Sequence, residues 1–288
     1  MSEKNIFAGA KTAKDDAGID DDYIRSGGAV ETDIYEGTIK AMFNRGSTKS
    51  KAMSIIVILD VAGREVMSQT WVTNGDGGIT YKDKKNGDKL KNLPGFNQMN
   101  TLALLVTGKA LGELSMEERT LKLWDATAKA EVNQVVDCYV DLHGEKVQVA
   151  IQKQIVDKEK LVEGSNPPRY EPTGETREIN EVVKYFPAEK LVTISEVAHY
   201  VKSIGESFDD LVEAGKLLKV ISKTPAEAGT YAEQWLKQNK GNTWNRSKAG
   251  GSGGSKGEGQ SFGGSKSDAG ESSGSGKKKA SSLFDDED

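Results

Sequence analysis

The first part of the body contains three stretches with the apolar alternation of β-strands, separated by short turns. In residues 53–61 the odd-numbered positions form the expected inward face: Met53, Ile55, Val57, Leu59 and Val61. A period of two predicts a strand with one buried face, and residues 34–43 and 65–73 show related patterns. Three consecutive strands joined by short turns form an antiparallel meander, which begins a small barrel or a strongly curved sheet.

The alternation also assigns faces within the outer two strands of this meander. On the first strand we expect one face to hold Tyr35, Ile39, Ala41 and Phe43. The other face of that strand is expected to hold Thr38, Lys40 and Met42. On the third strand Val66 and Val72 share one face, and the opposite face carries Met67, Gln69 and Trp71.

The rest of the body is expected to combine one helix with further strands and then with helices. Apolar residues at spacings of three and four predict a helix over residues 96–111, with Gly112 as its stop. Strands are expected over residues 117–124, 131–142, 146–157 and 177–186, with a loop at residues 163–172. Helices are expected over residues 194–219 and 225–240. This content favours a mainly β fold with some α-structure, an OB-fold-like antiparallel barrel with insertions and a C-terminal helical portion.

A lysine-rich, glycine-rich segment interrupts the strands at residues 73–94. It carries five lysines, Tyr81 lies directly before the first of them, and Trp71 lies two residues before the segment. Either this is a solvated hairpin, or it is a finger whose lysines follow phosphates while aromatic rings stack on bases. A second basic stretch, residues 37–51, contains no acid. The nucleic-acid contacts expected from both segments are Lys40, Arg45, Lys49, Lys51, Trp71, Tyr81, Lys82, Lys84, Lys85, Lys89 and Lys91.

Composition limits the classes of protein that remain. The chain has 288 residues and a net charge of -5, which disfavours a uniformly basic surface that would coat duplex DNA. Its single cysteine, Cys138, cannot form an internal disulfide and fits a reducing compartment. We expect a soluble, cytoplasmic protein, because no apolar run approaches the ~18 residues of a membrane span and no signal peptide is recognisable.

Residues 247–288 form a Gly/Ser-rich tail with an acidic end. This span of 42 residues contains 11 Gly and 11 Ser. A segment of this composition has too little apolar surface to offset the entropy cost of ordering the chain. We therefore expect a disordered tether. The tip ends in Leu283, Phe284, Asp285, Asp286, Glu287 and Asp288. Such a tip can compete with an anionic ligand for a basic groove or dock in a basic pocket of a partner; the alternative is a solubilising tail.

Catalytic patterns are absent from the sequence, so we do not expect an enzyme, a cofactor or a metal. The two histidines, His143 and His199, do not form a zinc-binding or a Ser-His-Asp pattern. Asp137 and Asp141 would share one face of a strand, but no well-placed lysine completes a metal-dependent nuclease site.

Two segments, Trp71–Leu111 and Thr173–Val182, together with the acidic tip, resemble the single-stranded DNA-binding proteins of tailed bacteriophages. The resemblance implies an OB-fold body that coats and protects single-stranded DNA in viral replication, recombination and repair, in the host cytoplasm. It also implies a tip that recruits replication proteins such as DNA polymerase, helicase or primase. In this chain Phe284 precedes the acids, whereas the bacterial single-stranded DNA-binding protein has its tip end on Phe. The chain also lacks the Cys/His cluster of the zinc-containing phage proteins.

These observations predict four regions. They are a flexible acidic arm at residues 1–30, an OB-fold-like core at 31–190, a helical portion packed on it at 191–246, and the tail at 247–288. A nuclease or recombination factor of phage DNA metabolism, or an RNA-binding protein, remains the alternative to a DNA-binding module, since stacking tolerates either sugar. The oligomeric state is open.

Overall fold

The computed structural model describes residues 28–47, 50–125, 128, 130–162, 164, 170–226 and 229–247. The chain divides into two units, residues 1–253 and 254–288, and every described residue belongs to the first. The predicted acidic arm, apart from residues 28–30, therefore lies outside the described residues. So does the tail beyond Ser247, including its tip.

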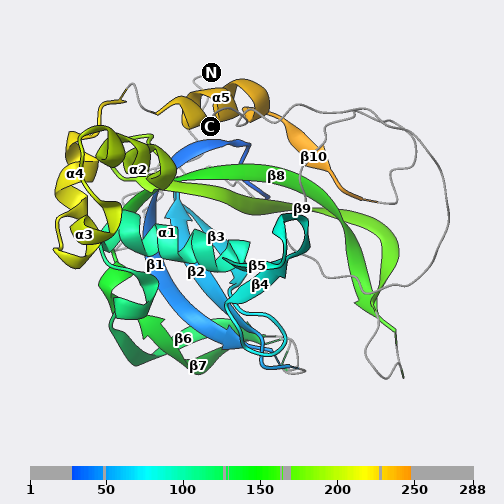
Figure 1. Cartoon of the computed structure of the whole chain (residues 1–288). Helices are drawn as coiled ribbons and strands as arrows, with labels where there is room; N and C mark the ends of the chain where they lie inside the picture. Colours follow the sequence, from blue (N-terminus) through cyan, green and yellow to red (C-terminus); the bar gives the residue numbers. More distant parts are fainter. Residues whose placement is uncertain are drawn as a thin grey trace, which may run out of the picture. The chain divides into compact units, whose positions relative to one another are not determined.

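An eight-stranded sheet forms the body (Figure 1). Its strands are β1 (Asp33–Gly46), β2 (Met53–Val61), β3 (Arg64–Trp71), β6 (Met116–Asp125), β7 (Ala130–Tyr139), β8 (Lys146–Leu161), β9 (Tyr170–Pro187) and β10 (Thr243–Asn245). A separate two-stranded sheet consists of β4 (Thr80–Asp83) and β5 (Lys89–Asn92). The α-helices are α1 (Pro94–Thr107), α2 (Ile194–Ser203), α3 (Phe208–Glu213), α4 (Leu217–Lys223) and α5 (Thr230–Asn239). Short 3₁₀ turns lie at η1 (Lys84–Asn86), η2 (Leu111–Glu113) and η3 (Val140–Leu142).

Strand β1 is the hub of the sheet. It pairs with β2 along most of its length, with β8 through its first half and with β7 near its end. All of these pairs are antiparallel; β10 joins β8 in parallel. The mainly β prediction, with an antiparallel sheet and a few helices, is therefore confirmed.

The sheet curls without closing into a barrel. Within the described residues no hydrogen-bonded ladder joins β3 to β9. The two strands approach through side chains instead: Tyr185 of β9 is buried close to Ser68 of β3. Burial raises the pKa of Tyr185, and the nearby Ser68 hydroxyl partly offsets that effect.

The main core lies between the inner face of this sheet and the helices. The predicted inward residues Ile55, Val57, Leu59 and Val61 are all buried there, and they pack with Met99 and Leu102 of α1. Helices α2, α3 and α4 contribute to the same core. Burying one large apolar side chain stabilises the fold by about 1.5–3 kcal/mol, so the helices and the sheet support each other.

A bulge at Lys40 overturns the predicted faces of the first strand. The register between β1 and β2 shifts between Ile39 and Ala41. One extra residue reverses the alternation that follows, so Ile39 and Met42 enter the main core. Ala41 and Phe43 instead enter a second, outer cluster with side chains of β2, β6 and β7.

Several predicted boundaries were wrong. Helix α1 ends at Thr107 rather than at residue 111. The expected helix over residues 194–219 is broken into α2, α3 and the start of α4, because Gly205 and Gly215 adopt positive φ angles of 77° and 64°. Strand β9 begins at Tyr170, inside the predicted loop. The sequence near Trp244, expected to end the body, forms β10 beside β8.

Candidate nucleic-acid interface

Arg45 and Trp71 lie on the same face of the sheet. Arg45 of β1 pairs with Ser54 of β2, and Ser54 pairs with Trp71 of β3. Directly paired residues on antiparallel strands point to the same side, so the three form one row. Arg45 is exposed and Trp71 is 49% exposed. An aromatic ring and a guanidinium group therefore share an open surface at the end of the meander.

Hydrogen bonds beneath this row keep its backbone in place. Gln69 Nε2 donates to Ser54 Oγ at 2.9 Å, and the Ser54 hydroxyl donates to the Arg45 carbonyl oxygen at 2.9 Å. Ser54 is fully buried, so these bonds satisfy a polar side chain that water cannot reach. The row is thus braced across all three strands of the meander.

The loop after Trp71 folds back beside Lys51. The Lys51 N–H donates to the Gly75 carbonyl oxygen at 3.1 Å, and the Met53 N–H donates to Thr73 Oγ1 at 2.7 Å. The Asn74 side chain accepts bonds from the N–H groups of Asp76 and Gly78, which is an Asx-type turn. Lys51 is exposed and stands where the basic finger leaves the sheet.

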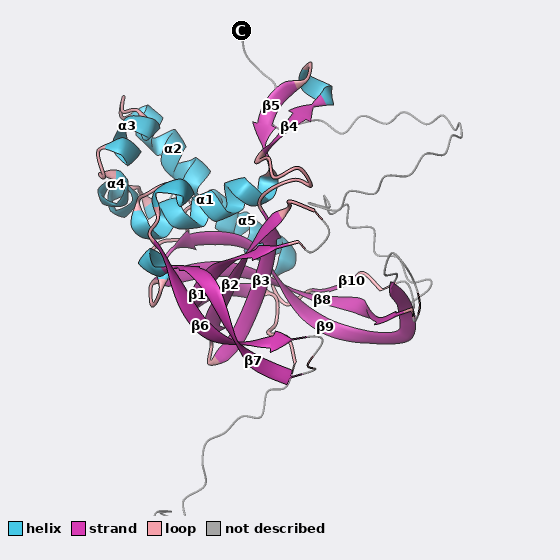
Figure 2. Ribbon diagram, turned by 90° about the horizontal axis from the view of Figure 1, so that it is seen from below, coloured by secondary structure: helices cyan, strands magenta, loops and turns pink. Residues whose placement is uncertain are grey.

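The basic segment forms the predicted hairpin, β4–β5, which we call the finger. Figure 2 shows it projecting away from the main sheet. Its ends are joined by a hydrogen bond from the Leu93 N–H to the Ile79 carbonyl oxygen at 2.8 Å. The finger contributes Tyr81, 40% exposed, and the exposed lysines Lys82, Lys84, Lys85, Lys89 and Lys91.

One finger lysine is neutralised locally. Tyr81 pairs with Lys91, so they share a face, and Lys91 Nζ lies 2.7 Å from Asp83 Oδ2. The hydrogen bond to this carboxylate raises the pKa of Lys91. Asp83 also accepts a bond from the Lys85 N–H, which fixes the turn of the finger. Its backbone is therefore organised while most of its charge remains exposed.

One of the predicted contacts, Lys40, lies away from Arg45 and Trp71. Lys40 forms an ion pair with Asp60 at 3.3 Å, and Asp60 pairs with Thr38 at the opposite end of the β1–β2 ladder from Arg45. Lys49 and the six residues of the tip lie outside the described residues. The structure brings together Arg45, Lys51 and Trp71, with the finger residues carried beside them on the projecting hairpin.

An outer apolar cluster on the same face of the sheet was not predicted from the sequence. It consists of Ala41, Phe43, Ile56, Ile58 and Cys138, with Leu121, Leu123 and Val136 packed against it. The apolar even-numbered residues of β2 were the available signal, because Ile56 and Ile58 would otherwise face solvent. Burial raises the pKa of the Cys138 thiol.

The expected pair of acids on one strand is wrong. Strand β7 ends at Tyr139, so Asp137 belongs to it, whereas Asp141 lies in η3. Asp141 accepts a hydrogen bond from the Ser115 N–H at 3.0 Å, and this bond, with nearby Lys109, lowers its pKa. Asp141 thereby ties together the two ends of the β6–β7 hairpin. Among the described residues no group of three or more His, Cys, Asp or Glu side chains could hold a metal ion.

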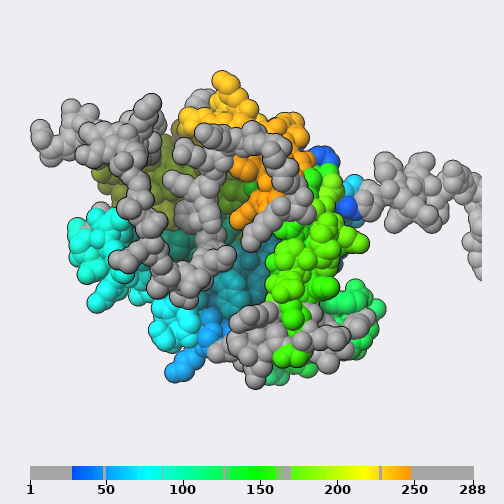
Figure 3. All heavy atoms as spheres, turned by 90° about the vertical axis from the view of Figure 1, so that its right-hand side faces the viewer, coloured from blue at the N-terminus to red at the C-terminus, as the bar shows by residue number. Residues whose placement is uncertain are grey.

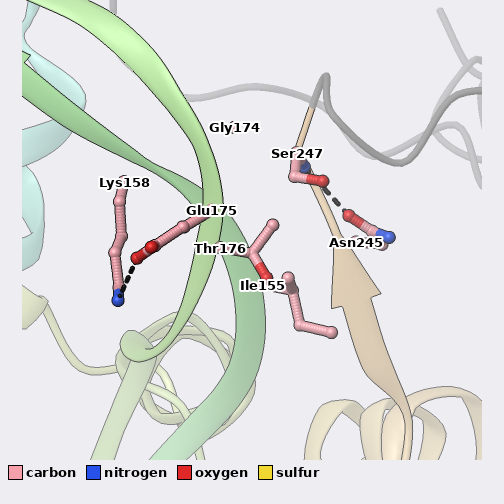
Figure 4. Close-up of a pocket in the computed structure, with 7 residues that line it drawn as sticks. All are labelled: Ile155, Lys158, Gly174, Glu175, Thr176, Asn245 and Ser247. Atoms are coloured by element: carbon pink, nitrogen blue, oxygen red, sulfur yellow. Dashed lines mark hydrogen bonds and ion pairs between the residues drawn. The ribbon is translucent and has the colours of Figure 1, made fainter.

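An open hollow of about 630 Å³ lies elsewhere, between the hairpin of β8 and β9, which we call the β8–β9 arm, and β10 (Figure 4). Its charged groups are paired: Lys158 Nζ lies 2.8 Å from Glu175 Oε2. In Figure 3 the arm, in bright green, and the finger, in cyan, lie on opposite sides of the view. The hollow is lined by Ile155, Lys158, Gly174, Glu175, Thr176, Asn245 and Ser247, none of which was predicted to bind nucleic acid.

Comparison of the chain with protein-family models and with curated protein sequences gives no match. Within the described residues, no helix has the length and apolar character needed to cross a membrane.

Proposed function

We propose that this protein binds single-stranded DNA without strong sequence preference, through the outer face of its meander and the finger. It would coat and protect the strand during replication, recombination and repair. The observation that carries the proposal is the row Arg45–Ser54–Trp71, which exposes an aromatic ring and a guanidinium on one braced surface. A ring that can stack on any base, beside cations that attract phosphates, is the usual arrangement for this kind of binding.

The finger supports the same proposal through its charge. Between Thr80 and Asn92 it carries five lysines and two aspartates. Single-stranded DNA places a negative charge at every phosphate, so each lysine that contacts one releases a counterion and strengthens binding at low salt. With Tyr81 on the face that holds Lys91, the finger can repeat the stacking-plus-cation arrangement of the sheet.

The OB-fold assignment belongs to this proposal. The chain order of β1, β2, β3, α1 and the hairpin β8–β9, with β8 pairing β1, follows the order of elements in that fold. The open side between β3 and β9 is compatible with a partly open barrel. In this reading the finger extends the β3–α1 connection, and β6–β7 is an insertion before β8.

We further propose that the acidic tip, Leu283–Asp288, recruits replication proteins such as DNA polymerase, helicase or primase. Its four acids suit a basic pocket, and Leu283 and Phe284 add apolar contacts. This part of the proposal rests on the sequence alone.

Titration with oligo(dT) tests the DNA-binding proposal. Stacking is worth roughly 1–3 kcal/mol per base, so Trp71→Ala should weaken binding about tenfold or more. Quenching of tryptophan fluorescence should disappear in Trp71→Phe and persist in Trp124→Phe, because Trp124 lies on the opposite face of β6 from Leu121 and Leu123. Unchanged affinity in a folded Trp71→Ala protein would contradict the proposed surface.

Parallel titrations separate the alternatives. Duplex DNA and oligo(U) should bind more weakly than oligo(dT), and oligo(dT) should remain intact in Mg²⁺. Equal or tighter binding of oligo(U) would favour an RNA-binding protein, and cleavage would favour a nuclease. Four to six phosphate contacts should give a slope of about -3 to -4 in log K against log salt.

A further inference from the structure

A continuous row of residues crosses five strands on the face of the sheet that carries Trp71. Glu117 of β6 pairs with Cys138 of β7, Cys138 with Phe43 of β1, Phe43 with Ile56 of β2, and Ile56 with Gln69 of β3. Paired residues share a face, so β6 and β7 extend the surface that carries Trp71. With strands about 4.8 Å apart, the row is roughly 19 Å wide along the sheet.

The middle of this surface is apolar and covered. Phe43 and Ile56 are each 2% exposed, although both point away from the main core. Only side chains on the same face can bury them, and Leu121, Leu123 and Val136 of the β6–β7 hairpin pack there. The hairpin therefore curves over β1 and β2. Polar groups remain at two margins, near Trp71 on one side and on β6 on the other.

Arg119 stands at the β6 margin of this surface. It alternates with Leu121 and Leu123, so all three side chains point to the same side of β6. Burial raises the pKa of the Cys138 thiol, and the positive charge of Arg119 partly offsets this increase. The Arg119 side chain is 48% exposed, and one guanidinium nitrogen lies 2.9 Å from Glu117 Oε2. A guanidinium held this way remains open to a second anion.

We propose that Arg119 binds a backbone phosphate of the single-stranded DNA that passes over Trp71. The strand runs from the finger side to the β6–β7 hairpin along the exposed margin that holds Trp71 and Arg45, and not over the covered apolar middle. Figure 2 shows β1, β2 and β3 lying between those two hairpins. Glu117 competes with the phosphate for Arg119 in the free protein and weakens binding. The inference rests on the proposed function and extends the proposed DNA-binding surface to Arg119 at its far margin.

The chain provides a matched control on the same strand. Lys122 lies on the opposite face of β6 and is also exposed and ion-paired, with its Nζ 3.3 Å from Glu131 Oε2. Arg119→Gln and Lys122→Gln each remove one cation and break one surface ion pair. They differ in the face from which the charge is lost.

The test compares oligo(dT) affinity of the full chain and these variants across a series of salt concentrations. Arg119→Gln should weaken binding roughly three- to tenfold at low salt and make the salt slope shallower by about 0.7, the contribution of one phosphate. Lys122→Gln should match the unmodified protein. Glu117→Gln should strengthen binding about two- to threefold.

Thermal unfolding of each variant shows whether the fold is intact. If Arg119→Gln matches Lys122→Gln in affinity and slope while Trp71→Ala still weakens binding, the inference is wrong and the proposed function stands. If the unmodified protein does not bind oligo(dT), the proposed function fails and the role of Arg119 fails with it.

Discussion

At the scale of single residues, the bulge at Lys40 decides what the outer surface displays. Without the extra residue, the alternation set by Ile39 would turn Arg45 toward the core. The bulge instead sends Met42 inward and places Phe43 and Arg45 outward. One residue thus moves a cation to the row that holds Trp71.

Gly95 holds the start of α1 against the end of β3. A Cβ atom at this position would lie 2.0 Å from the Trp71 carbonyl oxygen and 2.9 Å from Thr70 Cγ2. We expect Gly95→Ala to lower the free energy of unfolding by about 1–3 kcal/mol or more, because backbone must move to relieve the overlap. Denaturant unfolding measures this.

Gly112→Ala is the control for that substitution, since no heavy atom outside its neighbours lies within 4 Å of the added Cβ. Equal stability of the two variants would mean that α1 does not approach Trp71 as closely as described.

At the scale of elements, the finger is structurally separable from the body. Its two strands pair only with each other among the described strands. Ile79 and Leu93 are already joined by a hydrogen bond, so a two-residue Asn-Gly turn can replace residues 80–92. The body should keep its stability, because the finger adds no residue to the main core.

The finger replacement should weaken oligo(dT) binding and make the salt slope shallower by about 2, corresponding to three net charges at about 0.7 each. A second variant, with the five finger lysines changed to Gln, tests charge without removing the hairpin. Salt titration of both variants gives the result. An unchanged slope in both would show that the finger is a solvated hairpin.

At the scale of the whole molecule, helices and sheet form one body. Val197, Leu211 and Leu217, from α2, α3 and α4, are buried in the same core as the meander. Strand β10 then returns to β8 and leads to Ser247 beside the β8–β9 arm. The helical portion is thus part of the fold that supports the sheet.

Deletion of Leu283–Asp288 tests the tip at this scale. The four negative charges of the tip are expected to compete with DNA for the basic surface, so the deletion should raise oligo(dT) affinity about two- to tenfold at low salt. Salt of 0.1 M or more should reduce this gain. A pull-down should also lose the replication partner. Deletion of the six residues Gly270–Ser275 is the matched control. If both deletions behave alike, the tip is a solubilising end.

Local sequence patterns were enough to predict where most strands and helices form. The period of two in residues 53–61 and the spacing of apolar residues in α1 are local signals, and both elements form, although α1 ends at Thr107 and not at residue 111. The same alternation predicted that Val66 and Val72 share one face, and both are buried in the main core. Trp71 was assigned to the opposite face, where the structure leaves it 49% exposed.

Which residues of different strands lie on the same face of the sheet depends on long-range pairing, which local patterns do not contain. The bulge at Lys40 depends on the register between β1 and β2, which hydrogen bonds between distant residues set. The pairing of Phe43 with Cys138 brings β6–β7 onto the outer surface, and no local pattern encodes a contact across that separation. The pairing of β6 with β7 and of β7 with β1 places Arg119 on the same face of the sheet as Trp71, and no local pattern around Arg119 indicates this.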